Sequence, residues 1–533
     1  EHMHVFSVGL KALANFDFED WFSIQNNYWK PKIFEGIDRP EFLSQLWVER
    51  YDAEEHFYDF SPVGKNAERL FDKTLSHSIR LDGLKRHLNI SVDTVRFYDH
   101  HSCHAYYAYY GSHIRADNTI IYTLDGGGDS VTSTVFQVQD GRPNELARSN
   151  KVDVARIYRE VTQLMGMKLG EHEFKVMGLA PYATDREMTK SWKFFDGMFE
   201  TRQNMISYVE GRQPKDLHFA MHDAFKGHRF DGIAAAVQRM CETTVLDWVN
   251  TVQAKYKSKN AVFAGGVAMN VKLNMLISEL EVLEDFYVCP SPTDDTLCVG
   301  ACYMAESRIS NEASENLYPV DDPYMGPAYD PKSLPTDIVS TRVAEVADVV
   351  EDSSPEFIAQ LLASGKVISR CVGRMEFGQR ALGNRSILAD PRSDAAVQRI
   401  NKQIKYRDFW MPFAPVMLAE RAEEYIYTKN KRIQRPYMMI GAKTTEQGSL
   451  EFPAAIHAAD KTARPQVLER SHNPDYYDLI KCFESITGTG GLLNTSFNLH
   501  GEPIVCSPKD AISTFKRSAL DVLVLDGITL VRR

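Results

Sequence analysis

Cysteine and long apolar runs are both scarce in this sequence. Its 533 residues include 8 cysteines, and no two of them form a Cys-x-x-Cys pair. A disulfide-rich secreted framework needs a denser pattern, so we expect reduced thiols in a cytoplasmic protein. No segment approaches the roughly 20 apolar residues that a membrane helix needs. The first residues also lack the basic flank and apolar core of a secretory signal. We therefore expect no membrane association.

Positive charge is in deficit as well. Lysine and arginine total 61 against 72 aspartates and glutamates, which leaves a formal charge of −11. An acidic chain is a poor candidate for broad binding to nucleic acid, so we expect no nucleic-acid partner. The balance does not exclude a local basic pocket for a phosphate. Fixed-period repeats and low-complexity tracts are also absent, and the composition is that of a globular protein.

The pattern of apolar residues predicts an α/β fold in two parts. We expect strands over 4–10, 119–124, 131–138, 261–264, 365–370 and 522–525, and helices over 68–87, 230–256 and 297–304. Residues 309–345 are rich in Pro, Asp, Ser and Tyr, which is typical of a linker. We therefore predict an N-terminal domain over 1–340 and a C-terminal domain over 341–533.

A group of histidines opens the first candidate site. On the helix predicted around 100–110, His100 and His104 lie one turn apart and share a face. His101 and His104 share a face nearly as well. Two imidazoles on one face hold a transition metal if carboxylates complete the coordination sphere. A cluster of satisfied, partly exposed histidines has the same spacing, so the pattern alone leaves both interpretations open.

Glycine-rich turns follow two predicted strands. One strand ends at Asp125, and Gly127 lies in the turn after it; backbone N–H groups of such a turn approach phosphate oxygens while the acidic residue holds a cation. Gly265 and Gly266 separate another strand from a helix, whose N-terminus favours anions. An ordinary hairpin turn and simple close packing are the respective alternatives.

Asp294 and Asp295 precede an apolar helix, where either could instead be an N-cap. Each of these motifs is weak when taken alone. The combination of imidazoles, glycine turns and isolated acidic residues indicates a metal-assisted nucleotide site.

The second half of the chain is rich in groups suited to phosphate. Arginine matches phosphate oxygens bidentately, lysine supplies a point charge, and hydroxyl and amide groups add neutral donors. The candidates are Arg380, Arg385, Lys402, Lys405, Arg407, Arg464, Ser496 and Asn498. A solvated basic face is the alternative, but it does not explain why two arginines bracket the apolar pair Ala381-Leu382.

Five longer segments carry a family resemblance. They are 170–181 (GEHEFKVMGLAP), 262–270 (VFAGGVAMN), 375–392 (MEFGQRALGNRSILADPR), 405–415 (KYRDFWMPFAP) and 493–505 (LNTSFNLHGEPIV). Together they resemble the O-carbamoyltransferases of antibiotic and nodulation-factor biosynthesis. The resemblance implies an actin-like ATPase (Kae1-like) fold for the N-terminal domain and a YrdC-like α/β fold for the C-terminal domain.

The resemblance also implies a two-step reaction. Carbamoyl phosphate and ATP give carbamoyl adenylate, and the carbamoyl group then passes to a hydroxyl of a natural-product acceptor with release of AMP. The implied partners are ATP, carbamoyl phosphate and a hydroxylated small molecule. Fe(II), or another divalent metal, and Mg²⁺ with ATP are the implied cofactors. The acceptor is not identified, and a homodimer is left open.

Site residues follow from the resemblance, position by position. The metal ligands are His100, His104, Asp125 and Asp294, and for His104 we favour the role of ligand over that of base. The adenylate or ATP is held by Gly127, Lys175, Gly265, Gly266 and Asn270. Carbamoyl phosphate and the ATP phosphates are held by Arg380, Arg385, Lys405, Arg407, Arg464, Ser496 and Asn498. The catalytic roles belong to Arg385 in activation and to His100 and His104 in transfer.

The chain departs from the family pattern at three points. Residues 11–14 (KALA) stand where the family carries His-Asp-x-Ser-Ala. That histidine is either absent or lies in a segment not included in this sequence, and we favour the second interpretation. Trp410-Met411 replaces Phe-Arg, which removes one arginine. Asp294-Asp295-Thr296 stands where the family carries Asp-Ala/Ser-Gly, so there are two candidates, Asp294 and Asp295, for the second acidic metal ligand.

Two other functions are compatible with parts of the pattern. Threonylcarbamoyl transfer to tRNA would favour a basic surface around the metal site. An actin- or chaperone-like ATPase would have no use for the C-terminal arginines and would release ADP rather than AMP.

Overall fold

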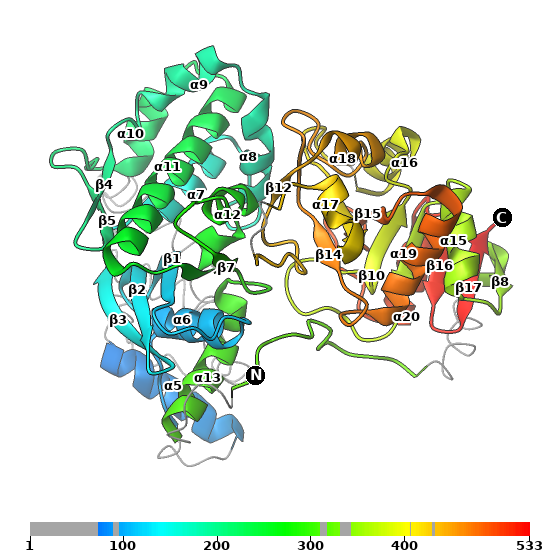
Figure 1. The fold of residues 1–533 in the computed structure, drawn as a ribbon, viewed down its shortest axis with the longest axis horizontal. Helices are drawn as coiled ribbons and strands as arrows, with labels where there is room; N and C mark the ends of the chain where they lie inside the picture. Colours follow the sequence, from blue (N-terminus) through cyan, green and yellow to red (C-terminus); the bar gives the residue numbers. More distant parts are fainter. Residues whose placement is uncertain (1–72, 89–94, 310–316, 331–342, 406, 429–431) are drawn as a thin grey trace, which may run out of the picture. The chain divides into compact units, whose positions relative to one another are not determined.

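The computed structural model describes residues 73–88, 95–309, 317–330, 343–405, 407–428 and 432–533 (Figure 1). The chain divides into two compact units, Glu1–Asp99 and His100–Arg533. In the first unit, helix α5 (Lys73–Leu88) corresponds to the helix predicted over 68–87. The predicted strand over 4–10 and the departure at 11–14 lie outside the described residues. Every candidate site residue belongs to the second unit.

A five-stranded sheet forms the frame of the first half of this unit. Its order is β3-β2-β1-β6-β7, with β1 (Ile120–Gly128), β2 (Val131–Gln139), β3 (Arg142–Ser149), β6 (Asn260–Ala264) and β7 (Asp285–Tyr287). Strands β1 and β2, which correspond to those predicted over 119–124 and 131–138, pair as an antiparallel hairpin. Strand β6 runs parallel to β1, with Ala264 beside Thr123. The carboxyl ends of β1 and β6 therefore meet at one edge, where ligand sites of α/β sheets form.

Helices cover this sheet. They are α6 (His100–Tyr110), α7 (Val154–Leu164), α8 (Glu173–Leu179), α9 (Asp185–Trp192), α10 (Leu217–Ala224), α11 (Phe230–Tyr256), α12 (Val271–Ser278) and α13 (Leu297–Ile309), with the short hairpin β4 (Phe199–Arg202) and β5 (Met205–Tyr208). Helix α11 matches the helix predicted over 230–256. Helices α6 and α13 pack so closely that a Cβ at Gly300 would lie 1.9 Å from the carbonyl oxygen of Cys103. A glycine is therefore required there.

An eight-stranded sheet forms the second half, in the order β14-β11-β15-β10-β9-β16-β17-β8. Its strands are β8 (Ala347–Val350), β9 (Ile368–Cys371), β10 (Arg385–Ala389), β11 (Ala414–Leu418), β14 (Gln466–Leu468), β15 (Gly491–Ser496), β16 (Val522–Leu525) and β17 (Ile528–Arg532). Further elements are α15 (Pro355–Ala363), α16 (Asp394–Ile400), α17 (Ala422–Tyr425), α18 (Glu446–Glu451), α19 (Pro474–Thr487), α20 (Pro508–Arg517), β12 (Ala442–Lys443) and β13 (Thr462–Ala463).

Both faces of this sheet are buried, because successive side chains of a strand point to opposite faces. Ile387 and Leu493 join a core with Phe515 of α20. Leu388 and Leu492, one residue along each strand, join a different core with α15 and α19. A sheet with helices on both faces is an α/β layer structure, which confirms the predicted fold class. Strands β9 and β16 correspond to those predicted at 365–370 and 522–525.

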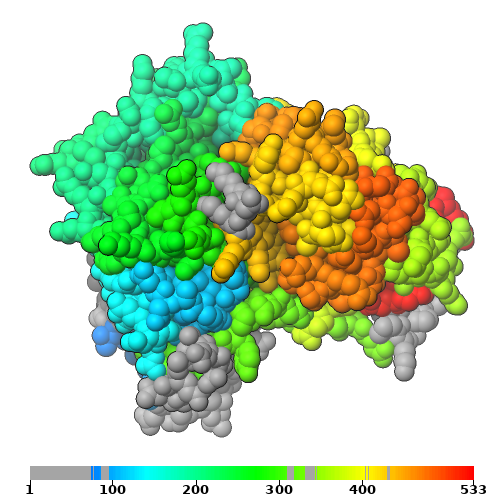
Figure 2. All heavy atoms as spheres, viewed as in Figure 1, coloured from blue at the N-terminus to red at the C-terminus, as the bar shows by residue number. Residues whose placement is uncertain are grey.

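The two halves of this unit are in direct contact. The Asn274 side chain of α12 donates a hydrogen bond to the carbonyl oxygen of Met439 (2.7 Å), and Lys272 forms an ion pair with Asp460. Figure 2 shows the green surface of the first half adjoining the orange surface of the second. The predicted domain boundary near 340 stays a prediction. Among the described helices, none combines the length and apolar character needed to cross a bilayer.

Candidate active site

Two histidines and two aspartates converge beside the end of β1. The Nε2 atom of His104 lies 3.3 Å from Asp125 Oδ2 and 3.3 Å from Asp294 Oδ1. The Nε2 atom of His100 lies 3.9 Å and 3.5 Å from the same two oxygens. One candidate ligand atom from each residue lies within 4.8 Å of the other three. The structure thus brings together the four predicted metal ligands, and we call them the His–Asp cluster.

Local backbone features hold this cluster in place. Helix α6 begins at His100, whose backbone N–H donates to the carboxylate of Asp129 (2.9 Å). A Cβ at Gly128 would lie 2.2 Å from Cγ of His100, so a glycine is needed to admit the imidazole ring. The backbone N–H of Gly266 donates to Asp125 Oδ2 (3.2 Å). The glycine turns therefore shape and orient the cluster.

Two neighbouring residues stay outside the cluster. The ring of His101 hydrogen-bonds Thr123 Oγ1 (2.7 Å) and the carbonyl oxygen of Val131 (2.9 Å), and burial together with the neighbouring histidines lowers its pKa to about 4. The Asp295 carboxylate is exposed and accepts a hydrogen bond from the hydroxyl of Thr293 (3.0 Å). Of the two competing aspartates, Asp294 is the one that faces the histidines.

The His–Asp cluster has the charge and spacing of a cation site. Burial acts to lower the pKa of His104, but its interactions with Asp125 and Asp294 raise the pKa to about 9. Burial acts to raise the pKa of Asp125, yet His100 and His104 hold it well below its usual range. The buried Nε2 atoms of both histidines have no hydrogen-bond partner. Separations of 3.3–3.9 Å are long for hydrogen bonds but suit atoms that share one ion at about 2.0–2.2 Å. The residues present therefore fit a divalent metal ion.

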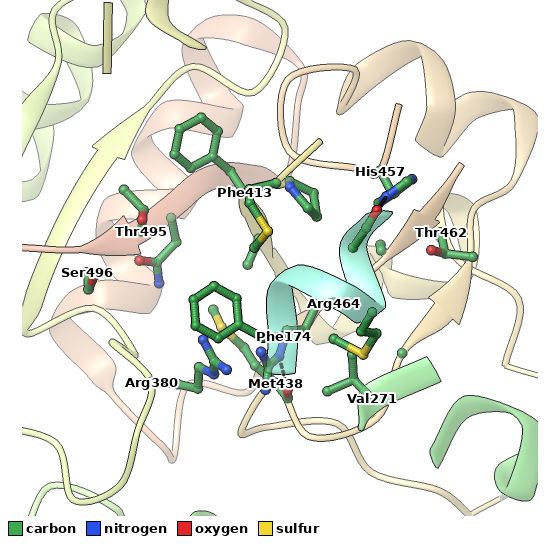
Figure 3. A pocket seen from close by; sticks show the side chains of 18 of the residues that line it. Phe174, Val271, Arg380, Phe413, Met438, His457, Thr462, Arg464, Thr495 and Ser496 are labelled. Atoms are coloured by element: carbon green, nitrogen blue, oxygen red, sulfur yellow. Dashed lines mark hydrogen bonds between the residues drawn. The ribbon is translucent and has the colours of Figure 1, made fainter. Parts of the chain in front are cut away.

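A cavity of about 290 Å³ lies between α8, α12 and the second sheet. Three of the predicted arginines line it, namely Arg380, Arg407 and Arg464, together with Thr495 and Ser496 at the end of β15. Figure 3 labels Arg380, Arg464, Phe174 and Met438 among the side chains that line it. We call this the arginine cavity. Its apolar lining, which includes Phe174 and Met438, was not predicted from the sequence, although Phe174 lies in one of the family-like segments.

The three arginines of the cavity have no carboxylate partner in the part of the chain that the structure describes. Burial and the charge of Arg407 lower the pKa of Arg380 to about 10, and burial lowers the pKa of Arg407 to about 10. Burial and Arg380 hold the pKa of Arg464 well below its usual range. Among the described residues, no carboxylate forms an ion pair with any of the three. The buried Nε of Arg380 and Nη2 of Arg464 also lack hydrogen-bond partners. Buried unpaired charge is costly, so the cavity is suited to an anion that accepts from arginine.

The side chain of Lys405 contacts Ser496, which lines the cavity, and Asn498. The Lys405 Nζ donates to the carbonyl oxygen of Ser496 (2.5 Å), to its hydroxyl (3.1 Å) and to Asn498 Oδ1 (2.5 Å). Burial and the charge of Arg407 lower the pKa of Lys405 well below its usual range. Of the three, Ser496 lines the cavity. The other two side chains support it, and their contact with phosphate stays a prediction.

Arg385 lies elsewhere. It is 1% exposed, does not line the arginine cavity, and directs its guanidinium to five backbone carbonyl oxygens. Its Nε donates to Cys506, Nη1 to Val372 and Asn384, and Nη2 to Gly373 and Pro327, at 2.7–3.5 Å. In this arrangement the side chain joins three chain segments, and it would have to give up these bonds to reach a phosphate.

Arg385→Met is therefore expected to lower the free energy of unfolding by about 3–5 kcal/mol, because it leaves buried carbonyl groups without donors. Chemical denaturation measures the change. Arg470→Met removes an exposed arginine that pairs with Asp478 and serves as the control. Normal stability together with a loss of catalysis would instead support the predicted role of Arg385 in activation.

None of the five predicted adenylate residues lines the arginine cavity. Asn270 caps α12 by accepting from the backbone N–H of Leu273 (3.0 Å) and donates to Gln238 (2.9 Å). The Lys175 Nζ lies 3.2 Å from the carboxylate of Asp408. Gly265 has a φ of +92°, and a Cβ there would lie 2.4 Å from the carbonyl oxygen of Leu124. Gly127 and Gly266 flank the His–Asp cluster. Binding of adenylate by these residues stays a prediction.

Two family models match successive parts of this chain. The carbamoyltransferase N-terminus family model matches residues 44–303, and the carbamoyltransferase C-terminus model matches residues 359–532. Nodulation protein NolO of Bradyrhizobium diazoefficiens is 32% identical over 447 residues, which span 82% of this chain and 79% of that protein. Nodulation protein NolNO of Sinorhizobium fredii is 31% identical, spanning 87% of this chain and 69% of its own.

A protein of Methanocaldococcus jannaschii, MJ1051, is 32% identical over 92% of this chain and 95% of its own length. Among solved structures, full-length HypF in a phosphate- and nucleotide-bound form aligns over 34% of this chain and 22% of its own. That alignment has 19% identity and a TM-score of 0.24, a score too low to inform function. The two family models and the long alignments confirm the resemblance found in the sequence: this chain belongs to the carbamoyltransferase family and is an enzyme that transfers carbamoyl groups.

Proposed function

We propose that this carbamoyltransferase uses ATP to activate its donor and works at two separate sites. In the arginine cavity, water cleaves carbamoyl phosphate to carbamate and phosphate, and a carbamate oxygen then attacks the α-phosphorus of ATP to give carbamoyl adenylate with release of pyrophosphate. At the His–Asp cluster, the carbamoyl group passes to a hydroxyl of a small-molecule acceptor and AMP leaves. The observation that carries this proposal is a cavity of three arginines, without carboxylate partners among the described residues, in the same compact unit as the His–Asp cluster.

The arginine cavity supplies what the activation step needs. Carbamate is a poor electrophile, and joining it to AMP creates a better leaving group. Negative charge builds up on the phosphates during that step, and preorganised cationic donors stabilise it in a site with little water. Arg380, Arg407 and Arg464 supply the charge, while Thr495 and Ser496 add hydroxyl donors. The apolar lining by Phe174 and Met438 protects a species that water would hydrolyse.

The His–Asp cluster supplies what the transfer step needs. His100, His104, Asp125 and Asp294 would hold a divalent ion, Fe(II) or a related metal, and Mg²⁺ would accompany ATP. When bound, such an ion polarises a carbonyl group as a Lewis acid. A ligating imidazole nitrogen cannot also accept the acceptor's proton, so His104 acts as a ligand. We propose a hydroxylated natural product as the acceptor, since the acidic chain is poorly suited to tRNA.

Product analysis tests the proposal. With ATP and carbamoyl phosphate, the purified enzyme should support ATP–pyrophosphate exchange, and complete turnover should yield AMP and pyrophosphate in equal amounts. Chromatography of radiolabelled nucleotide measures both, and omission of carbamoyl phosphate is the control. Release of ADP and phosphate instead would contradict the two-step reaction and favour a conformational ATPase on the same fold.

A further inference from the structure

One glutamine side chain connects the arginine cavity, which it lines, with the segment that carries Asp294. The Nε2 atom of Gln379 donates to the hydroxyl of Thr293 (3.1 Å) and to the carboxylate of Asp295 (3.3 Å). Gln379 immediately precedes Arg380, which lines the arginine cavity. Thr293 and Asp295 flank Asp294, which belongs to the His–Asp cluster. A single amide therefore connects the backbone segment of a cavity arginine with that of a cluster ligand.

The cavity side of this connection is anchored. Glu376 is 7% exposed, and its Oε1 atom accepts hydrogen bonds from the backbone N–H groups of Leu382 (2.8 Å), Asn384 (2.7 Å) and Arg385 (3.1 Å). Both ends of the 376–385 loop are thereby tied to one buried carboxylate. These hydrogen bonds hold the two ends of the loop together, so the ends do not readily shift when the loop tip, which carries Gln379, moves.

The cluster side is anchored as well. The carbonyl oxygen of Pro292 accepts from the backbone N–H of Gly265 (2.8 Å). The hydroxyl of Thr296 donates to the carbonyl oxygens of Ser291 (3.0 Å) and Thr293 (2.9 Å). Gln379 thus connects two segments that are each held at their own base, and its amide fixes the spacing between them.

We propose that Gln379 is a positioning residue that couples the two sites, so that an anion in the arginine cavity and a metal ion at the His–Asp cluster strengthen each other's binding. The inference rests on the proposed function, because it needs both ligands. When one ligand binds, it restricts the motion of the segment that holds it. The hydrogen bonds of Gln379 pass this restriction to the other segment, so the second ligand loses less conformational entropy when it binds.

The hydrogen bond between Gln379 and Asp295 can be tested by exchanging its donor and its acceptor. Gln379→Glu places a second carboxylate against Asp295 and replaces a hydrogen bond by repulsion. Adding Asp295→Asn restores a donor–acceptor pair with the roles exchanged. Gln379→Leu removes the donor without adding charge. Gln447→Glu is the matched control, because Gln447 is an exposed glutamine that donates to Glu451 (2.9 Å) on α18, outside both sites.

The experiment measures the Kd of Mn²⁺ by electron paramagnetic resonance, with and without saturating methyl phosphate, on full-length protein whose folding is verified by thermal melting. In the wild-type protein and in Gln447→Glu, we expect methyl phosphate to lower the Kd about fivefold, the effect of roughly 1 kcal/mol of hydrogen bonding. The effect should vanish in Gln379→Leu and Gln379→Glu and return in Gln379→Glu/Asp295→Asn.

Three results would overturn the inference, and they are distinguishable. Coupling that survives Gln379→Leu would assign the link to other residues. Wild-type protein that binds both probes independently would show that there is no coupling, while the proposed function stands. Wild-type protein that binds neither Mn²⁺ nor methyl phosphate would remove the proposed function itself, and the inference with it.

Discussion

His104→Ala is expected to abolish carbamoyl transfer and stoichiometric binding of a divalent metal, while ATP–pyrophosphate exchange stays within about twofold of the wild type. The ring of His104 is fully buried, and its Nε2 lies closer than that of His100 to both carboxylates of the His–Asp cluster. Removing it takes away one of four ligands and leaves Asp125 and Asp294 facing one another. We expect transfer to fall by about 10³-fold or more, the range found when electrostatic stabilisation of a transition state is lost.

Two measurements separate this outcome from simple misfolding. Thermal melting reports on folding and the exchange assay reports on the arginine cavity, while metal analysis reports on the cluster. His222→Ala removes an exposed histidine on α10 and is the control. A folded His104→Ala protein that has lost exchange would show that the cluster takes part in activation, and the assignment of one step to each site would then be wrong.

Arg380→Met is expected to have the opposite pattern of effects. Charge-assisted hydrogen bonds contribute about 1.5–3 kcal/mol each, so the loss of a bidentate arginine should slow ATP–pyrophosphate exchange by about 10²–10³-fold. Metal binding at the His–Asp cluster should persist. The melting temperature should be unchanged or higher, because the substitution removes a buried positive charge that lies near Arg407 and pairs with no carboxylate of the described segments.

The comparison with Arg385→Met makes this result specific. The two arginines are five residues apart in the sequence, yet one faces the cavity and the other is held by five carbonyl groups. We expect Arg380→Met to slow ATP–pyrophosphate exchange without lowering the free energy of unfolding. We expect Arg385→Met to lower the free energy of unfolding. Wild-type exchange in Arg380→Met would contradict the assignment of the arginine cavity to activation.

Local periodicity was sufficient to locate the elements that carry the His–Asp cluster. The hairpin of β1 and β2, the helix beginning near His100 and the strand that ends before Gly265 all follow from patterns within short segments. The one-turn spacing of His100 and His104 requires only a helix. The spacing alone does not show whether His104 or His101 belongs to the His–Asp cluster, because that depends on where Thr123 and Val131, the partners of His101, lie after folding.

The sequence by itself determined the fold class, the family and the residue types available for each site, because these depend on local pattern and on motifs several residues long. Only the tertiary structure decided which aspartate faces the histidines, which arginine lines the cavity, and that Gln379 reaches the turn beside Asp294. Those outcomes depend on the packing of segments about 85 to 190 residues apart. Whether a buried polar group faces a ligand or a backbone carbonyl is set by the partners that packing brings within hydrogen-bond distance.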